Sequence, residues 1–149
     1  MYMSSTEQAL FVKQSLGPTF LQNQIDTKII IYDHNADRIA YPISVLNDLT
    51  ARQYIDGSAF HLYGGNISDL SVLKSAHPDK NLYFTEQWVG APGDLFGDLR
   101  WHIRNLIIGA SRNWCKTIIE WNLASDENQK PHTDGGCSGC LGAVTITVN

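Results

Sequence analysis

The chain has little basic charge, few cysteines and no long apolar segment. Eleven lysines and arginines stand against fifteen aspartates and glutamates among 149 residues, so the formal net charge is −4. This balance provides no broad basic face and argues against nucleic acid as a partner. The longest apolar runs, such as 106–110, are too short for a transmembrane segment. No secretory pattern is present at the N-terminus, so we expect either a cytosolic protein or a chain without its targeting segment.

Metal-binding spacing is also scarce. Cys137 and Cys140 form one C-x-x-C within GGCSGC, and the remaining cysteine is Cys115. A tetrahedral zinc site needs two more ligands at matching spacing. His132 is near, but there is no second C-x-x-C and no H-x-x-x-H, so we expect neither a metal site nor a cofactor. The other interpretation is a Gly-rich surface loop, with a disulfide in a secreted protein or two thiols otherwise.

The hydrophobic pattern alternates between helices and buried strands. Apolar residues at helical spacing predict helices, the first capped by Ser4 and Glu7 and kinked or broken at Gly17-Pro18. Continuous β-branched and aromatic runs predict strands buried on both faces. We expect helices over 4–21, 41–54, 67–76 and 95–112, and strands over 27–32, 57–63, 81–85, 115–121 and 144–148. This order predicts an α/β fold with a parallel sheet.

Polar and aromatic side chains follow each of the first four predicted strands. In parallel α/β folds, functional residues gather at the carboxyl ends of the strands. Those ends carry Asp33-His34-Asn35, His61 with Tyr63, Glu86 to Trp88, and Glu120 to Asn122. Because these positions are equivalent, the sequence predicts a ligand site at this edge of the sheet.

Two architectures fit this order of elements. A doubly wound sheet can be complete in about 150 residues, but it usually carries a G-x-G-x-x-G loop after its first strand, and residues 33–35 do not match one. A (β/α)8 TIM barrel takes about 250 residues, so four units form half of one. We therefore expect a fragment of a larger barrel.

Five segments, taken in order, resemble glycoside hydrolase family 30. They cover almost the whole chain: KIIIYDHN, DGSAFHLYGG, NLYFTEQWVG, GDLRWHIRNLIIGASRNW and IIEWNLASD. This family contains retaining β-glycosidases, among them glucosylceramidases and β-1,6-glucanases. The resemblance implies a (β/α)8 barrel with an attached β-sandwich, of which residues 1–149 are about strands five to eight. The first half of the barrel and the β-sandwich are then absent from this chain.

The resemblance also implies roles for individual residues. Glu86, in its T-E context, matches the nucleophile at the end of strand seven. His61 and Tyr63 match the strand-six residues beside the nucleophile and the sugar, and Trp121 matches a tryptophan of the glucose subsite. The acid/base glutamate follows an asparagine in an N-E-P-like motif, and this sequence contains no such motif. A secreted or periplasmic enzyme acting on a β-glucoside or β-glucan is implied.

Each of these residues also has a structural interpretation. Glu86 could be an ion-pair carboxylate, and His61 a core histidine. Tyr63 lies two positions along the same strand and therefore on the same face, so His61 and Tyr63 are either both in the site or both outside it. Trp88 could pack against the helices instead of stacking on a sugar. The polar cluster at His34 could reach the sugar or orient its neighbours. Glu120, just before Trp121, is expected to point away from it and to pair with a helix residue.

The rival hypothesis is a non-catalytic carbohydrate-binding or interaction fragment. A half-barrel exposes two sheet edges and apolar faces that the other half normally covers, so it is expected to self-associate. Without the acid/base glutamate, we expect the isolated chain to have no appreciable glycosidase activity. The natural substrate is left open among glucosylceramide, β-1,6-glucan and other β-glucosides.

Overall fold

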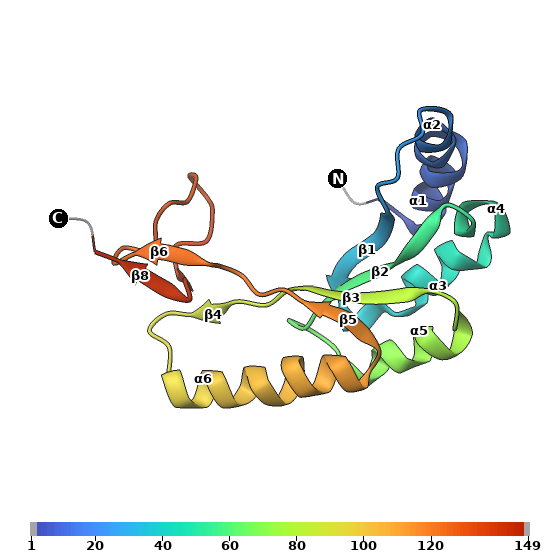
Figure 1. Ribbon diagram of the computed structural model, residues 1–149. Helices are drawn as coiled ribbons and strands as arrows, with labels where there is room; N and C mark the ends of the chain where they lie inside the picture. Colours follow the sequence, from blue (N-terminus) through green and yellow to red (C-terminus); the bar gives the residue numbers. More distant parts are fainter. Residues whose placement is uncertain (1–2, 148–149) are drawn as a thin grey trace.

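A curved sheet of four parallel strands organises the computed structural model, which describes residues 3–147 (Figure 1). The strands are neighbours in chain order: β1 (Ile29–Asn35), β2 (Ile55–His61), β3 (Asn81–Glu86) and β5 (Cys115–Ile118). The predicted parallel α/β sheet is therefore confirmed. Because each strand lies beside its predecessor, every connection crosses in the same direction, as in a barrel and unlike a doubly wound sheet.

The helices lie on one face of this sheet (Figure 1). They are α1 (Ser5–Phe11), the π-helical η1 (Val12–Leu16), α2 (Gly17–Gln22), the short η2 (Ala36–Arg38), α3 (Ala40–Asn47), α4 (Leu49–Arg52), η3 (Ile67–Asp69), α5 (Leu70–Ala76), α6 (Leu95–His102) and the π-helical η4 (Ile103–Ala110). The capping box of Ser4 and Glu7 is confirmed. Of the two alternatives at Gly17-Pro18, the break is wrong, because the π-helical η1 leads directly into α2, whose first turn contains Pro18.

The core lies between the sheet and the helices. Ile31, Phe60 and Phe84 face the helices and are at most 2% exposed, and burying a side chain of this size contributes about 1.5–3 kcal/mol. The opposite face is more open, since Ile30 is 41% exposed. The expectation that the first strand is buried on both faces is therefore wrong: within residues 3–147, no second layer covers its inner face.

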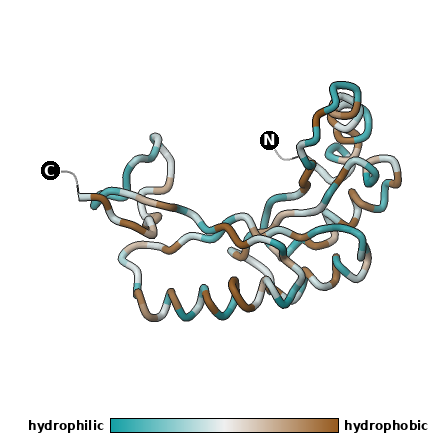
Figure 2. Tube along the Cα trace, viewed as in Figure 1, coloured by the Kyte–Doolittle hydropathy of each residue, from teal (hydrophilic) through white to brown (hydrophobic). Residues whose placement is uncertain are grey.

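The long helix predicted over 95–112 forms as α6 followed by η4, but its apolar side is only partly covered. Leu106 and Ala110 are fully buried. Figure 1 shows α6 projecting past the sheet, and brown, hydrophobic positions recur along this helix in Figure 2. Four apolar residues of α6 and η4 stay exposed: Leu95 74%, Leu99 52%, Ile103 43% and Ile107 50%. The sheet thus buries only the part of the helix that lies beneath it.

Two small strand pairs extend from the sheet (Figure 1). β4 (Val89–Gly90) pairs antiparallel with β7 (Cys140–Leu141), and β6 (Ala124–Asp126) pairs parallel with β8 (Val144–Ile146). The predicted strand 144–148 therefore forms from Val144 but joins β6, not the main sheet, and Val148 lies outside the described residues. No helix within residues 3–147 is long and apolar enough to span a membrane.

Candidate active site

Irregular strand ends shape the edge of the sheet where polar residues gather. Phe60 pairs with Phe84, but His61 pairs with Glu86, so Thr85 is an extra residue in β3. The register of β1 against β2 shifts in the same way between Tyr32 and His34. Such bulges redirect the side chains that follow them. Here the β3 bulge sets Glu86 beside His61 at the rim of the sheet.

The bulge in β1 requires a strained backbone. Tyr32 and Asp33 have φ angles of 76° and 58°, in the left-handed region, although neither is glycine. Holding such a residue there costs about 1–3 kcal/mol, and the surrounding structure must impose it. The result is that Asp33 turns toward β2 and β3, where its Oδ1 accepts a 2.6 Å hydrogen bond from Thr85 Oγ1.

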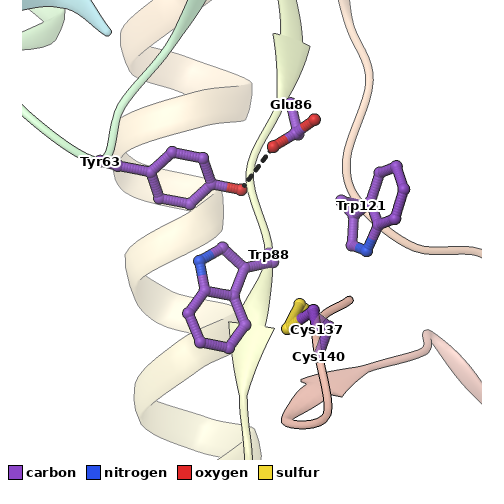
Figure 3. Close-up of a pocket in the computed structure, with 6 residues that line it drawn as sticks. All are labelled: Tyr63, Glu86, Trp88, Trp121, Cys137 and Cys140. Carbon is purple, nitrogen blue, oxygen red and sulfur yellow. Dashed lines mark hydrogen bonds between the residues drawn. A yellow bond between two sulfur atoms is a disulfide. The ribbon is translucent and has the colours of Figure 1, made fainter. Parts of the chain in front are cut away.

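Glu86 has one hydroxyl donor and one imidazole close to its carboxylate. Tyr63 Oη donates to Glu86 Oε1 at 3.1 Å (Figure 3), and His61 Nδ1 lies 3.9 Å from the same oxygen. Burial raises the pKa of Tyr63 well above its ordinary value of 10, and the Glu86 charge and hydrogen bond add to this increase. The tyrosine therefore stays protonated at neutral pH and remains a donor to the carboxylate.

His61 bridges two carboxylates. Its Nε2 lies 3.2 Å from Asp33 Oδ1, on the side of the ring opposite Glu86. The ring of His34 meets His61 edge-on, with centroids 6.4 Å apart. Asp33 and His34 thus contact His61 in this structure, and neither lines the cavity beside Glu86.

A cavity of about 300 Å³ opens beside Glu86 (Figure 3). Tyr63 contributes a hydroxyl and Glu86 a carboxylate, and the ring faces of two indoles and a disulfide contribute apolar surface. The lining residues are Tyr63, Glu86, Trp88, Trp121, Cys137 and Cys140. The structure thus brings together four of the six residues singled out in the sequence, with His61 directly behind the carboxylate and His34 one ring farther away.

The backbone after Glu86 positions the two tryptophans. Gln87 is buried, its Oε1 accepts from Leu62 N–H at 3.2 Å, and its carbonyl accepts from Trp121 N–H at 2.8 Å. Gly90 lets the Trp88 ring lie close, since a Cβ at this glycine would be 2.9 Å from the indole. Sequence reasoning missed Gln87, because nothing in its local pattern separates a strand-joining glutamine from an exposed one.

The disulfide was also missed as a site component. Cys137 and Cys140 are bonded, which is one of the two interpretations that the sequence allowed. Their C-x-x-C spacing indicated a small loop, but it carried no signal that this loop returns to the end of β3. The expected partner of Glu120 is confirmed: His102 Nδ1 of α6 lies 2.5 Å from Glu120 Oε2. Residues 3–147 contain no cluster of three or more His, Cys, Asp or Glu able to hold a metal ion.

Residues 1–136 match the glycosyl hydrolase family 30 TIM-barrel domain. The chain belongs to glycosyl hydrolase family 30. The resemblance stated from the sequence is therefore confirmed, and the sequential parallel sheet agrees with a family 30 barrel.

The similar proteins include some named as endo-1,6-glucanases and some named as glucosylceramidases. The endo-1,6-beta-D-glucanase of Aspergillus fumigatus is 36% identical over 98% of this chain, and a Caenorhabditis elegans protein named for glucosylceramidase is 28% identical over 89% of it. The solved endo-β1,6-glucanase BT3312 superposes with a TM-score of 0.94 at 39% identity, over 98% of this chain. The chain covers 29%, 28% and 34% of these three proteins, respectively, so it spans about a third of each relative's length.

Proposed function

We propose that this chain is the C-terminal half of the barrel of a retaining β-glycosidase, with Glu86 as its nucleophile. The observation that carries the proposal is the setting of Glu86. It ends β3, its Oε1 accepts from Tyr63 Oη at 3.1 Å, and it borders a cavity lined by Trp88 and Trp121. Attack on an anomeric carbon requires a carboxylate that is held by a hydrogen-bond donor and borders a cavity whose apolar walls can hold a sugar.

The proposed reaction proceeds in two displacements. A Glu86 carboxylate oxygen attacks the anomeric carbon as the glycosidic C–O bond breaks, and an acid protonates the leaving oxygen. This step leaves a glycosyl ester on Glu86. The same acid group, now a base, then takes a proton from water, whose oxygen attacks the anomeric carbon and frees the Glu86 carboxylate. Retention needs the two carboxyl groups about 5–5.5 Å apart.

The neighbouring residues have distinct proposed roles. Tyr63 orients the attacking carboxylate through its hydroxyl, and His61 lies beside the same carboxylate oxygen. Trp88 and Trp121 offer indole faces to the apolar C–H faces of the sugar. His34, whose ring packs edge-on against His61, is proposed to bind substrate at the outer edge of the site. The roles of Tyr63, His61, Trp88 and Trp121 are supported by proximity to the cavity or to Glu86, and that of His34 by its contact with His61.

The acid/base group is proposed to lie outside this chain. The chain is proposed to supply strands five to eight, so the acid/base glutamate would come from strand four of the other half, and the side β-sandwich from elsewhere in the protein. The share of the relatives that the chain covers supports this reading. Half a catalytic pair does not complete the reaction, so we expect the isolated chain to show no appreciable hydrolysis.

We propose a β-1,6-glucan as the substrate, with glucosylceramide as the second candidate. The two endo-1,6-glucanase relatives are more similar to this chain than the glucosylceramidase-named relative is. We also propose a secreted or periplasmic location, which the Cys137–Cys140 disulfide supports because disulfides persist in oxidising compartments.

Covalent labelling tests this proposal. We define the extended enzyme as this chain preceded by the first half of a family 30 barrel. It is treated with a 2-fluoro β-glucoside, which forms the glycosyl ester but hydrolyses slowly, and the labelled peptide is identified by mass spectrometry. We expect the label on Glu86, and no labelling when Glu86→Gln is introduced. A folded extended enzyme that is labelled at another residue, or at none, contradicts the assignment.

The alternative function is a non-catalytic sugar-binding fragment. The apolar lining of the cavity favours it, because Trp88 and Trp121 can stack on a sugar without any chemistry at Glu86. Under this alternative, the Glu86→Gln variant of the extended enzyme still binds sugar, and neither the variant nor the unsubstituted extended enzyme takes the covalent label.

A further inference from the structure

The cavity beside Glu86 has a wall that the proposed chemistry does not use. This wall is the disulfide turn, defined as residues 137–140, which lies across the cavity from Tyr63 (Figure 3). A disulfide has no N–H or O–H to donate, and its sulfurs are soft and polarisable. It therefore offers a sugar no hydrogen-bond donor, whereas Tyr63, Glu86 and the indole N–H groups of Trp88 and Trp121 are side-chain groups of the lining that can hydrogen-bond.

The two ends of the turn are held unequally. Cys140 is 7% exposed and belongs to β7, which pairs with β4: Gly90 faces Cys140 and Val89 faces Leu141. A further hydrogen bond runs from Ala91 N–H to Gly139 O at 2.8 Å. Cys140 is thus fixed to the segment that carries Trp88, whichever state its sulfur is in.

Cys137 depends on the crosslink for its position. It is exposed, and it lies in a stretch without helix or strand between Pro131 and Gly139. The bond to Cys140 closes a ring across three positions of sequence and brings Cys137 to the cavity. Breaking that bond leaves β4 and β7 paired but removes the restraint on the residues before Cys140.

We propose that the disulfide turn is a specificity-determining wall of the sugar cavity, which tightens sugar binding and takes no part in breaking the bond. This inference rests on the proposed function and adds to it a residue pair that contacts the sugar ring opposite Tyr63. Hydrogen-bonding groups combined with apolar indole faces and a disulfide suit a pyranose with equatorial hydroxyls, whose ring faces are C–H surfaces. Opening the wall weakens the contact with the ring but leaves Glu86, Tyr63 and His61 in place.

Inactivation kinetics separate binding from chemistry. The extended enzyme is treated with the 2-fluoro β-glucoside, which yields a dissociation constant for the reversible complex and a rate constant for formation of the ester. For Cys137→Ser combined with Cys140→Ser, we expect the dissociation constant to rise about tenfold while the rate constant stays within about twofold. Cys115→Ser is the matched control: this thiol lies in β5, outside the cavity lining, and should change neither.

Reversible reduction of the folded enzyme provides a second test that does not depend on the folding of the double variant. In the Cys115→Ser background, dithiothreitol breaks the S–S bond, supplies two electrons and two protons to the sulfurs, and itself closes into a cyclic disulfide. The reduced enzyme should show the same weakened binding, and reoxidation should restore it. An unchanged dissociation constant in the reduced enzyme overturns the proposal, as does a rate constant that falls as far as binding weakens.

A readout on the 149-residue chain is independent of catalysis. A disulfide beside an indole quenches its fluorescence, so reduction should raise the tryptophan emission of the Cys115→Ser chain, and the rise should be lost when Trp88→Phe and Trp121→Phe are combined. If the extended enzyme takes no label at Glu86, the proposed function fails and the kinetic part of this inference fails with it. If labelling succeeds but reduction alters neither emission nor binding, this inference alone is wrong.

Discussion

Glu86 owes its setting to a few residues that the sequence places far apart. Tyr63 reaches it from beyond β2, and His61 links it to Asp33 on β1. The rule that parallel strands end at one edge was enough to predict that Glu86, His61 and Tyr63 meet. The rule says nothing about loops that return from later in the chain, so it could not predict the disulfide as part of the site, and the local pattern around Gln87 does not reveal that its side chain joins two strand ends.

The first prediction concerns the hydroxyl on Glu86. Tyr63→Phe removes the donor at 3.1 Å, and a hydrogen bond to a charged group contributes about 1.5–3 kcal/mol. We therefore expect the rate constant for 2-fluoro glucoside labelling of the extended enzyme to fall about 10- to 100-fold. Tyr83→Phe is the matched control, since it removes a tyrosine hydroxyl bonded to another carboxylate, Asp56. Equal losses in the two variants would contradict a specific role for Tyr63.

Among the elements, the strands were predicted in type and order, but their ends were not. β1 runs to Asn35, three residues beyond the predicted Tyr32, and it does so through Tyr32 and Asp33 at positive φ. Neither residue is glycine, so no local signal marks the bulge, and tertiary contacts impose it. The π-helical turns of η1 and η4 are equally invisible in a pattern of apolar spacing.

Adjacent residues of η4 give the second prediction. Leu106 is fully buried against the sheet, whereas Ile107 is 50% exposed. Leu106→Ala should lower the free energy of unfolding by about 2–5 kcal/mol, because it leaves a cavity in the core. Ile107→Ala should change it by less than about 0.5 kcal/mol. Urea unfolding of both variants checks this, and similar losses at the two positions would place the core elsewhere.

The third prediction follows from the inner face of the sheet. Asp56 on β2 accepts hydrogen bonds from Tyr83 Oη and Asn81 Nδ2, and its Oδ1 lies 2.9 Å from Lys28 Nζ. Desolvation alone would raise the pKa of Asp56, but the hydrogen bonds and the lysine charge outweigh it and lower the pKa to about 2. Because the folded pKa lies below the unfolded value, this stabilisation is present above about pH 4 and is lost toward pH 2.

Asp56→Asn should therefore lower the free energy of unfolding by about 1–2 kcal/mol at pH 6. The difference from the wild type should shrink as the pH falls below about 4, measured by urea unfolding at a series of pH values. Asp26→Asn, at an exposed aspartate, serves as the control and should show little difference at any pH. If the difference in free energy of unfolding between Asp56→Asn and the wild type grew as the pH fell, the stabilisation by the ionised Asp56 carboxylate would be refuted.

For the whole molecule, the notable feature is apolar surface left open along α6. A hollow of about 700 Å³ lies between this helix and the segment around β4 and β7, next to Trp121. Leu95 and Leu99 line it and are more than half exposed. The apolar spacing over 95–112 predicted the helix, but no local pattern could reveal which part of it the sheet covers.

We propose that the isolated chain self-associates through this face of α6, which is the fourth prediction. The average mass from light scattering should rise with concentration, because association buries the exposed leucines. Leu95→Lys combined with Leu99→Lys should keep the chain monomeric. Leu21→Lys combined with Leu49→Lys changes leucines on α2 and α4 that are 72% and 75% exposed, and it should leave the association unchanged. A monomeric wild type at all concentrations would contradict this prediction.

Rescue by azide tests whether Glu86 is the nucleophile of a retaining glycosidase. Glu86→Gly in the extended enzyme should lower turnover of an aryl β-glucoside by about a thousandfold or more. Azide can then enter the space that the carboxylate left, attack from the same face and release an α-glucosyl azide, identifiable by NMR. Formation of that α-azide is the result we predict. Turnover within tenfold of the wild type without azide, or a β-glucosyl azide as the product, would contradict the claim.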